Sequence, residues 1–274
     1  MQAVPNKKKY INSEGSETAY YFVEHEGGGI SDSILIFMHG YTSDCTSTKA
    51  KAAFGKAIAK KIDGVAFDFF GHGDSSGTRE DFTPLDLYNQ ALEFISNVVI
   101  KERGYQSLYI VGFSVGGFIA SLFARDTGNL KNYIKGFYFI SPSFDWPLNK
   151  LPQLSMDQLL ELKGKGKVDV NLDPENTPVK EAVYMTEEMI KSTEKIRIFG
   201  GKKFEIFCPV FFVWGLSDRI SDPAGFDKFK ALLTGDVDGL LRIFWIPTGD
   251  HFLKREQDVH IVGIGYDDLL KNCS

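Results

Sequence analysis

The chain has 274 residues, of which 43% are hydrophobic and 14% aromatic, so it is long and apolar enough to bury one large core. Its formal net charge is −5 and its longest basic run is 7–9, which excludes nucleic acid and anionic lipid as expected partners. Three cysteines without a CxxC pair indicate neither a disulfide framework nor a zinc site, and without a long apolar run we expect no signal peptide, no membrane span and a cytoplasmic location.

The first part of the chain predicts strands and helices that alternate. Two short segments, 9–12 and 19–24, flank a polar turn and indicate an edge hairpin. SILIFM (33–38) is an unbroken apolar run, which is typical of a parallel strand covered on both faces. A helix is then predicted over 49–61 and a strand over 64–70.

The next helix has a clear start signal. Thr83 is expected to be its N-cap, with Pro84 in the first helical position and Asp86 completing a capping pattern. Its apolar stripe is expected to comprise Leu85, Tyr88, Leu92, Ile95 and Val99. Strands are predicted over 107–112 and 133–141, with a helix between them.

The regular alternation then stops for about 60 residues, which is longer than a crossover requires. Two helical segments, 156–162 and 185–196, are separated by the turn-rich sequences GKGK and NLDPENTP. We therefore divide the chain into a core, 1–146 and 207–274, and an inserted cap, 147–206. Apolar cap side chains are expected either to cover a substrate's acyl group or to pack the cap itself: Leu154, Met156, Leu159, Leu160, Val183, Tyr184, Met185 and Met189.

Alternation resumes with a strand at 208–215, a helix at 224–233, a strand at 240–247 and a final helix at 254–271. Strands that alternate with helices favour an α/β fold with a mainly parallel central sheet and helices on both faces. In such sheets, functional residues follow the carboxyl ends of the strands.

Ser114 is the candidate nucleophile. It lies in a GxSxG sequence, 112–116, between a predicted strand and a predicted helix. A sharp turn there directs a serine hydroxyl out of the sheet, and the glycines leave room for the close approach of neighbouring backbone. The N–H of Val115 and the N–H of Tyr41, in the loop after 33–38, are the expected donors to an oxyanion.

A serine nucleophile needs a base within hydrogen-bond reach and a carboxylate that orients this base. His251, in TGDHFL after the last strand, is the expected base, because the order in this architecture is serine, acid, histidine. His260 is expected on the surface of the last helix. His39 and Gly40 are expected to shape their loop rather than take part in the chemistry, and His72 is expected to be a bystander.

Asp218, in WGLSD after the penultimate strand, is the expected acid. Asp145, in SPSFDW after the preceding strand, is the alternative acid. Asp222 is expected to be a helix N-cap instead, because Pro223 follows it. GHGDSSG (71–77) is interpreted as a structural turn, and the sequence has no metal-ligand spacing such as HExxH, so no metal or cofactor is expected.

Taken in order, these motifs resemble the α/β-hydrolase family over residues 33–271. They are MHGY (38–41), DFFGHGDSSG (68–77), GFSVGG (112–117), WGLSD (214–218) and GDHF (249–252). The body of the chain is also similar to the mitochondrial acyl-protein thioesterases of this family and their bacterial relatives, and more loosely to cinnamoyl-type esterases. The resemblance implies a triad of Ser114, Asp218 and His251, with Tyr41 and Val115 as oxyanion donors.

The expected function is that of a serine hydrolase which cleaves a carboxylic ester or thioester through an acyl-enzyme. Its substrate is expected to be a small ester or acyl thioester, with an acylated protein as a further candidate. Peptide or C–C bond hydrolysis and a non-catalytic binding protein on the same fold are the alternatives. Nothing in the pattern selects the acyl chain, the cap conformation or the oligomeric state.

Overall fold

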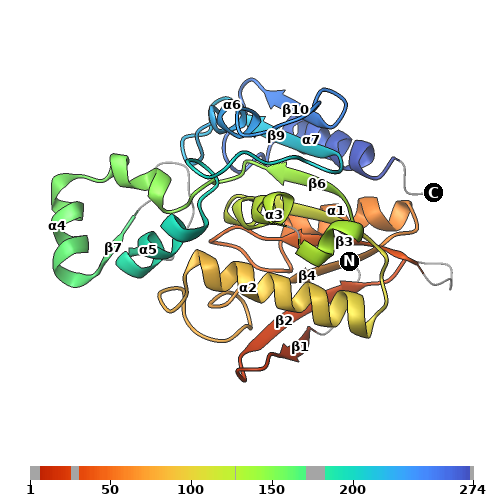
Figure 1. Ribbon diagram of the computed structural model, residues 1–274, viewed down its shortest axis with the longest axis horizontal. Coiled ribbons are helices and arrows are strands. Elements are labelled where there is room, and N and C mark those ends of the chain that lie inside the picture. The colour runs from red at the N-terminus through yellow and green to blue at the C-terminus, as the bar shows by residue number, and fades with distance from the viewer. Residues whose placement is uncertain (1–6, 26–30, 127, 171–182, 272–274) are drawn as a thin grey trace.

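The computed structural model describes residues 7–25, 31–126, 128–170 and 183–271. Its centre is an eight-stranded sheet in the order β1-β2-β4-β3-β5-β6-β9-β10 (Figure 1). These strands are β1 (Lys8–Ile11), β2 (Glu17–Val23), β3 (Ser33–Met38), β4 (Asp63–Phe67), β5 (Ser107–Phe113), β6 (Ile134–Ile140), β9 (Val210–Gly215) and β10 (Leu241–Ile246). β2 pairs antiparallel with β1 and β4, and the other neighbouring pairs are parallel. The predicted mainly parallel sheet is confirmed.

Helices cover both faces of the sheet. The central strands are apolar throughout because both of their faces are buried under these helices. They are α1 (Thr48–Ala59), α2 (Pro84–Phe94), α3 (Val115–Arg125), α4 (Met156–Lys165), α5 (Glu187–Ile196), α6 (Gly225–Lys230) and α7 (Glu256–Leu269). In β3, Ile34 and Ile36 belong to the core shared with α2 and α3, whereas Leu35 and Phe37 belong to the core shared with α1 and α7. The sheet therefore separates two hydrophobic cores.

The strand order reverses at β3, since the chain passes from β3 to β4 on one side and then to β5 on the other. Such a reversal leaves a crevice at the carboxyl ends of the two central strands. The loop that starts at residue 39 follows β3 here, and Ser114 follows β5.

The start of α2 agrees with the prediction from the sequence. The predicted capping box is present, because Thr83 Oγ1 accepts the N–H of Asp86 and the Asp86 carboxylate accepts the N–H of Thr83.

The expected apolar stripe of α2 is only partly right: Ile95 and Val99 are buried, but Leu85, Tyr88 and Leu92 are half-buried. The face turned to the sheet instead carries Pro84, Leu87, Gln90, Ala91 and Phe94. The side-chain amide of Gln90 makes two hydrogen bonds: its oxygen accepts the N–H of Phe70, and its nitrogen donates to the Asp68 carbonyl.

Three other expected boundaries shift. β4 ends at Phe67 rather than at residue 70, and the next residue, Asp68, accepts the N–H of Cys45 with its side chain. α2 continues as a π-helix, η1 (Ile95–Glu102). α6 begins at Gly225 with Ala224 as N-cap, so the expected N-cap at Asp222 is wrong. The Asp222 side chain accepts the N–H of Ala224 within a separate turn ahead of the helix.

Between β6 and β9 the chain leaves the sheet and forms small elements of its own (Figure 1). These are the 3₁₀ helix η3 (Leu148–Gln153), α4, α5 and the two-stranded antiparallel sheet of β7 (Lys167–Asp169) and β8 (Tyr184–Thr186); a short 3₁₀ helix, η2 (Gly128–Asn132), precedes β6. Val183, Met185 and Met189 are buried in the same core as α2 and α3. Met156 and Leu160 are 71% and 61% exposed. The turn NLDPENTP lies outside the described residues.

Candidate active site

The turn between β5 and α3 holds Ser114 in a backbone conformation that few residues adopt, with φ 55° and ψ −118°. The glycines on either side are required by packing. A Cβ at Gly112 would lie 2.3 Å from the Gly116 carbonyl oxygen, and one at Gly116 would lie 2.2 Å from that of Met38. The GxSxG sequence therefore permits a turn that presses Ser114 against the end of β3.

We expect Gly116→Ala to lower the free energy of unfolding by about 3 kcal/mol, because the added methyl meets the backbone of β3, which has little freedom to move aside. Urea denaturation measures this change. Gly55→Ala is the matched control: Gly55 lies inside α1 with open space around its Cβ position, so we expect a gain of about 0.5–1 kcal/mol. Equal effects of the two substitutions would contradict the crowding argument.

Ser114, His251 and Asp218 meet at the carboxyl ends of their strands. His251 Nε2 lies 2.9 Å from Ser114 Oγ, and His251 Nδ1 lies 2.9 Å from Asp218 Oδ2. All three residues are buried, with exposed fractions of 7%, 5% and 7% in the order Ser114, His251, Asp218. A hydroxyl, an imidazole and a carboxylate thus form one chain of hydrogen bonds.

The Asp218 carboxylate is held by its own loop. Oδ1 accepts the N–H groups of Ile220 and Ser221, each at 2.8 Å, and Oδ2 accepts the Ser221 hydroxyl at 2.7 Å. Burial opposes ionisation of this carboxyl, but the adjacent His251 imidazole and the bonds from Ser221 outweigh it and lower its pKa below the usual range. The carboxylate is therefore ionised at neutral pH and orients the imidazole.

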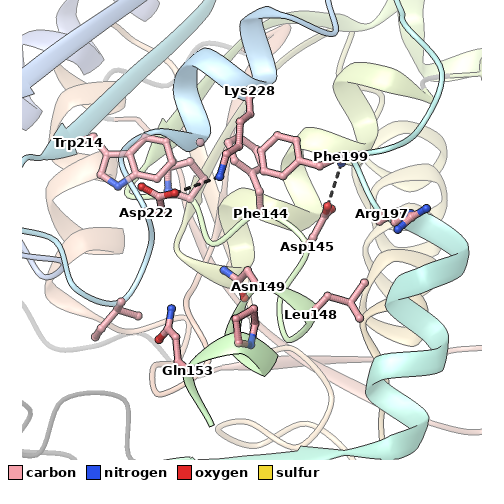
Figure 2. A pocket seen from close by; sticks show the side chains of 14 residues that line it. Phe144, Asp145, Leu148, Asn149, Gln153, Arg197, Phe199, Trp214, Asp222 and Lys228 are labelled. Carbon is pink, nitrogen blue, oxygen red and sulfur yellow. Dashed lines mark hydrogen bonds and ion pairs between the residues drawn. The ribbon is translucent and has the colours of Figure 1, made fainter.

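Asp145, the alternative acid, has other partners. It sits at φ 55°, and its two oxygens accept the N–H groups of Ile198 and Phe199 at 2.5 and 2.9 Å. Figure 2 shows Asp145 directed at Phe199, and both residues line a cavity of about 400 Å³ that Trp214 also lines. Burial raises the pKa of Asp145 despite these bonds. The carboxylate that contacts His251 is that of Asp218.

The loop after β3 lies directly against the nucleophile. A Cβ at Gly40 would be 3.1 Å from Ser114 Cβ, so the next residue, Tyr41, is close to the reacting centre. Val115 is the first residue of α3, and an N–H in this position has no partner within the helix. Both residues are buried, and their N–H groups are candidate oxyanion donors.

The two loop histidines hold this arrangement. His39 Nδ1 bonds the Gly40 carbonyl at 2.8 Å, and its Nε2 accepts the N–H of Phe69. His72 Nε2 lies 2.5 Å from the Tyr41 carbonyl oxygen. Burial lowers the pKa of His39 and lowers that of His72 to about 3. His72 Nδ1 lies 2.9 Å from the Phe70 carbonyl oxygen, so a neutral ring donates to only one of its two carbonyl neighbours. His39 shapes the loop, as expected, whereas His72, which we expected to be a bystander, contacts the Tyr41 carbonyl. His260 is on the surface, also as expected.

Sequence reasoning missed several buried polar residues near the triad. Ser143 Oγ is 3.2 Å from Ser114 Oγ. Lys150, only 3% exposed, donates from Nζ to the carbonyl of Ile220, the residue whose N–H binds Asp218. No motif marks these positions, and the only available signal was that Ser143 follows a strand of the predicted sheet.

Lys49 is a further lysine near the triad that no sequence motif identifies. Its Nζ bonds the carbonyl of Phe252, next to the base, and lies 4.6 Å from the ring centre of Phe113. Burial, with a smaller effect of the nearby Lys254 charge, lowers the pKa of Lys49 from 10.5 to about 8.

Lys49→Met is therefore expected to weaken the pH dependence of stability. Between about pH 8 and pH 10.5 the unfolded chain keeps a proton on Lys49 that the folded chain has released. The Lys49 contribution to the free energy of unfolding thus rises with pH in this window, and the variant loses that rise. Urea midpoints at the two ends of the window measure it, and Lys51→Met, at an exposed lysine of α1, controls for removal of one charge.

Two further observations concern groups away from the triad. Cys45 is buried, and burial raises its thiol pKa, so it is a poor nucleophile. Among the described residues, no cluster of three or more histidine, cysteine, aspartate or glutamate side chains is arranged to hold a metal ion. Within the same ranges, no helix has the length and apolar character needed to cross a membrane.

Residues 29–198 match the family model described as Serine aminopeptidase, S33. The chain is 25% identical over 250 residues to a Mus musculus protein named palmitoyl-protein thioesterase ABHD10, mitochondrial, and the match covers 88% of this chain and 76% of that protein. The corresponding Bos taurus protein is 24% identical over 243 residues, which cover 88% of this chain and 74% of that protein.

Solved structures show the same architecture. The mouse alpha/beta hydrolase domain-containing protein 10 matches with a TM-score of 0.80 at 20% identity, covering 98% of this chain and 100% of that chain. Est1E from Butyrivibrio proteoclasticus, with ferulic acid bound, matches with a TM-score of 0.72 at 19% identity, covering 96% of this chain and 97% of that one. At these identities the likeness concerns the fold, and the expected α/β-hydrolase fold is confirmed.

Proposed function

The chain belongs to the Serine aminopeptidase, S33 family and is a serine hydrolase of the α/β-hydrolase fold, and on this premise we propose that it hydrolyses acyl esters and thioesters through an acyl-enzyme on Ser114. The observation that carries the proposal is the continuous hydrogen-bond chain from Ser114 through His251 to Asp218. A non-catalytic binding protein would have no need of this geometry.

The mechanism starts from an ionised Asp218 and a neutral His251. With the Nδ1–H of His251 donated to Asp218, Nε2 carries no proton and can accept the hydroxyl proton of Ser114. Ser114 Oγ attacks the acyl carbon as its proton passes to Nε2, and the oxyanion is bound by the N–H groups of Tyr41 and Val115. His251 then protonates the leaving group, and a water molecule, deprotonated by His251, releases the acid.

The segment 147–206 is proposed to be a cap that selects the acyl group. It reaches the oxyanion loop directly, because the Tyr41 hydroxyl donates to the Tyr184 carbonyl at 3.2 Å. The Tyr41 ring also lies 4.7 Å from that of Trp146, the last core residue before the cap. Val183 and Met185 are buried in the core and hold this contact in place. Changes in the cap would therefore alter the shape of the site beside the nucleophile.

A long-chain acyl thioester, including one on a protein, is the substrate class we propose first. It is supported by the matched mouse and bovine proteins, whose names describe palmitoyl-protein thioesterases and which align over most of this chain. A peptide substrate is the second candidate, favoured by the description of the matched family as serine aminopeptidases. The fold itself does not choose between them.

The cytoplasm was the expected location and remains a proposal. The matched mouse and bovine proteins are named as mitochondrial. Fractionation of cells that express the tagged full chain tests the location.

A substrate panel tests the function. Purified protein is assayed with p-nitrophenyl esters and acyl-CoA thioesters of increasing chain length, and with aminoacyl p-nitroanilides. We expect turnover of both esters and thioesters, with a preference for longer chains. Turnover of short oxyesters alone contradicts the thioesterase proposal, and turnover of the anilides alone favours the peptide candidate.

A further inference from the structure

Ser143 is a second buried hydroxyl at the nucleophile. It lies in the loop after β6, is 1% exposed, and places its Oγ 3.2 Å from Ser114 Oγ. Its backbone N–H also donates to the Ser114 carbonyl at 3.0 Å, which fixes the two residues relative to one another. The contact is therefore part of the folded loop rather than a chance approach of two mobile side chains.

The direction of this hydrogen bond follows from the proton assignment above. The only hydroxyl proton of Ser114 is donated to His251 Nε2, because Nδ1 carries the imidazole proton toward Asp218. Ser114 Oγ has no second proton to give, so the proton between the two hydroxyls must be that of Ser143. Ser143 is thus the donor, and Ser114 Oγ is the acceptor.

We propose that Ser143 is a catalytic residue that stabilises the nucleophilic oxygen. This role rests on the function proposed above. Ser114 Oγ gains negative charge as its proton moves to His251, and again when it leaves the acyl carbon during deacylation. A hydrogen bond to an oxygen strengthens as that oxygen becomes charged, particularly where water is excluded. Ser143 keeps its own proton throughout, so it supplies stabilisation and takes no part in proton transfer.

Ser141 offers a matched control in the same loop. It is 0% exposed, and within the described residues its Oγ has no hydrogen-bond partner. Both serines are therefore buried hydroxyls two positions apart, and only one of them contacts the nucleophile. With p-nitrophenyl acetate as substrate, we expect Ser143→Ala to lower kcat/KM by about 10- to 100-fold and Ser141→Ala to change it by less than about twofold.

A pair of equal-sized variants separates chemistry from packing. Thr and Val have nearly the same shape, so Ser143→Thr and Ser143→Val share any cost of an added methyl and differ in the hydroxyl. We expect the Thr variant to be faster than the Val variant by about tenfold or more, both in kcat/KM and in the rate of labelling by a fluorophosphonate probe. The acid limb of the pH–rate profile is expected to keep its midpoint in all Ser143 variants, since the His251–Asp218 pair is unchanged.

Equal rates for the Thr and Val variants, or equal losses in Ser143→Ala and Ser141→Ala, would overturn the role of Ser143. A shifted midpoint of the profile would do so as well, because it would indicate displacement of the imidazole. These outcomes differ from failure of the proposed function itself, which would appear as absent turnover and absent labelling of the wild-type protein.

Discussion

Ser114→Ala is expected to lower kcat by about 10⁶-fold on any ester or thioester that the wild-type protein hydrolyses. The variant loses the oxygen that attacks the acyl carbon, while His251 and Asp218 keep their mutual hydrogen bond. Removal of one member of a triad costs almost as much as removal of all three, because the members act as a unit. Initial rates at saturating substrate, normalised to the protein concentration from absorbance at 280 nm, measure the effect.

Ser121→Ala is the control for this experiment. Ser121 is a fully buried serine of α3, the helix that follows Ser114. Its hydroxyl donates to the Phe118 carbonyl rather than to a catalytic group. We expect this variant to label and to turn over like the wild type. Labelling of the Ser114 variant at the wild-type rate would place the nucleophile elsewhere and remove the basis of the proposed mechanism.

Much of the fold could be predicted because the central strands of its sheet are buried. An apolar run such as 33–38 has few structural alternatives, and β3 begins and ends at the predicted residues. The start of α2 was equally clear, since Thr83 and Asp86 act on adjacent backbone and need no tertiary contact. Local signals of this kind can be interpreted without knowledge of the rest of the molecule.

The remaining features depend on contacts between distant residues. Asp145 and Asp218 both follow strands of the sheet, and the choice between them is made by backbone that the pattern does not reveal: Asp145 turns toward the N–H groups that follow α5. Lys150 is buried because it meets a carbonyl 70 residues further along the chain. Ser143 faces the nucleophile only because β5 and β6 are neighbours in the sheet.

Substitution of the triad acid, Asp218, is expected to have the second largest effect on kcat. Asp218→Asn is expected to lower kcat by about 10⁴-fold with little change in KM. Oδ1 accepts the N–H groups of Ile220 and Ser221, so the single oxygen of an asparagine must occupy this position, and its NH₂ group then faces His251. Nδ1 must accept this donor, which moves the imidazole proton to Nε2, and Nε2 can no longer take the proton of Ser114.

Two further aspartates separate this effect from a general loss of stability. Asp145→Asn replaces a carboxylate that binds two backbone amides, so it is expected to lower the free energy of unfolding by about 1–3 kcal/mol while kcat changes only a few-fold. Asp222, exposed and paired with Lys228, is expected to tolerate the same change in both measurements. A large loss of kcat in Asp145→Asn, together with a small one in Asp218→Asn, would reverse the assignment of the acid.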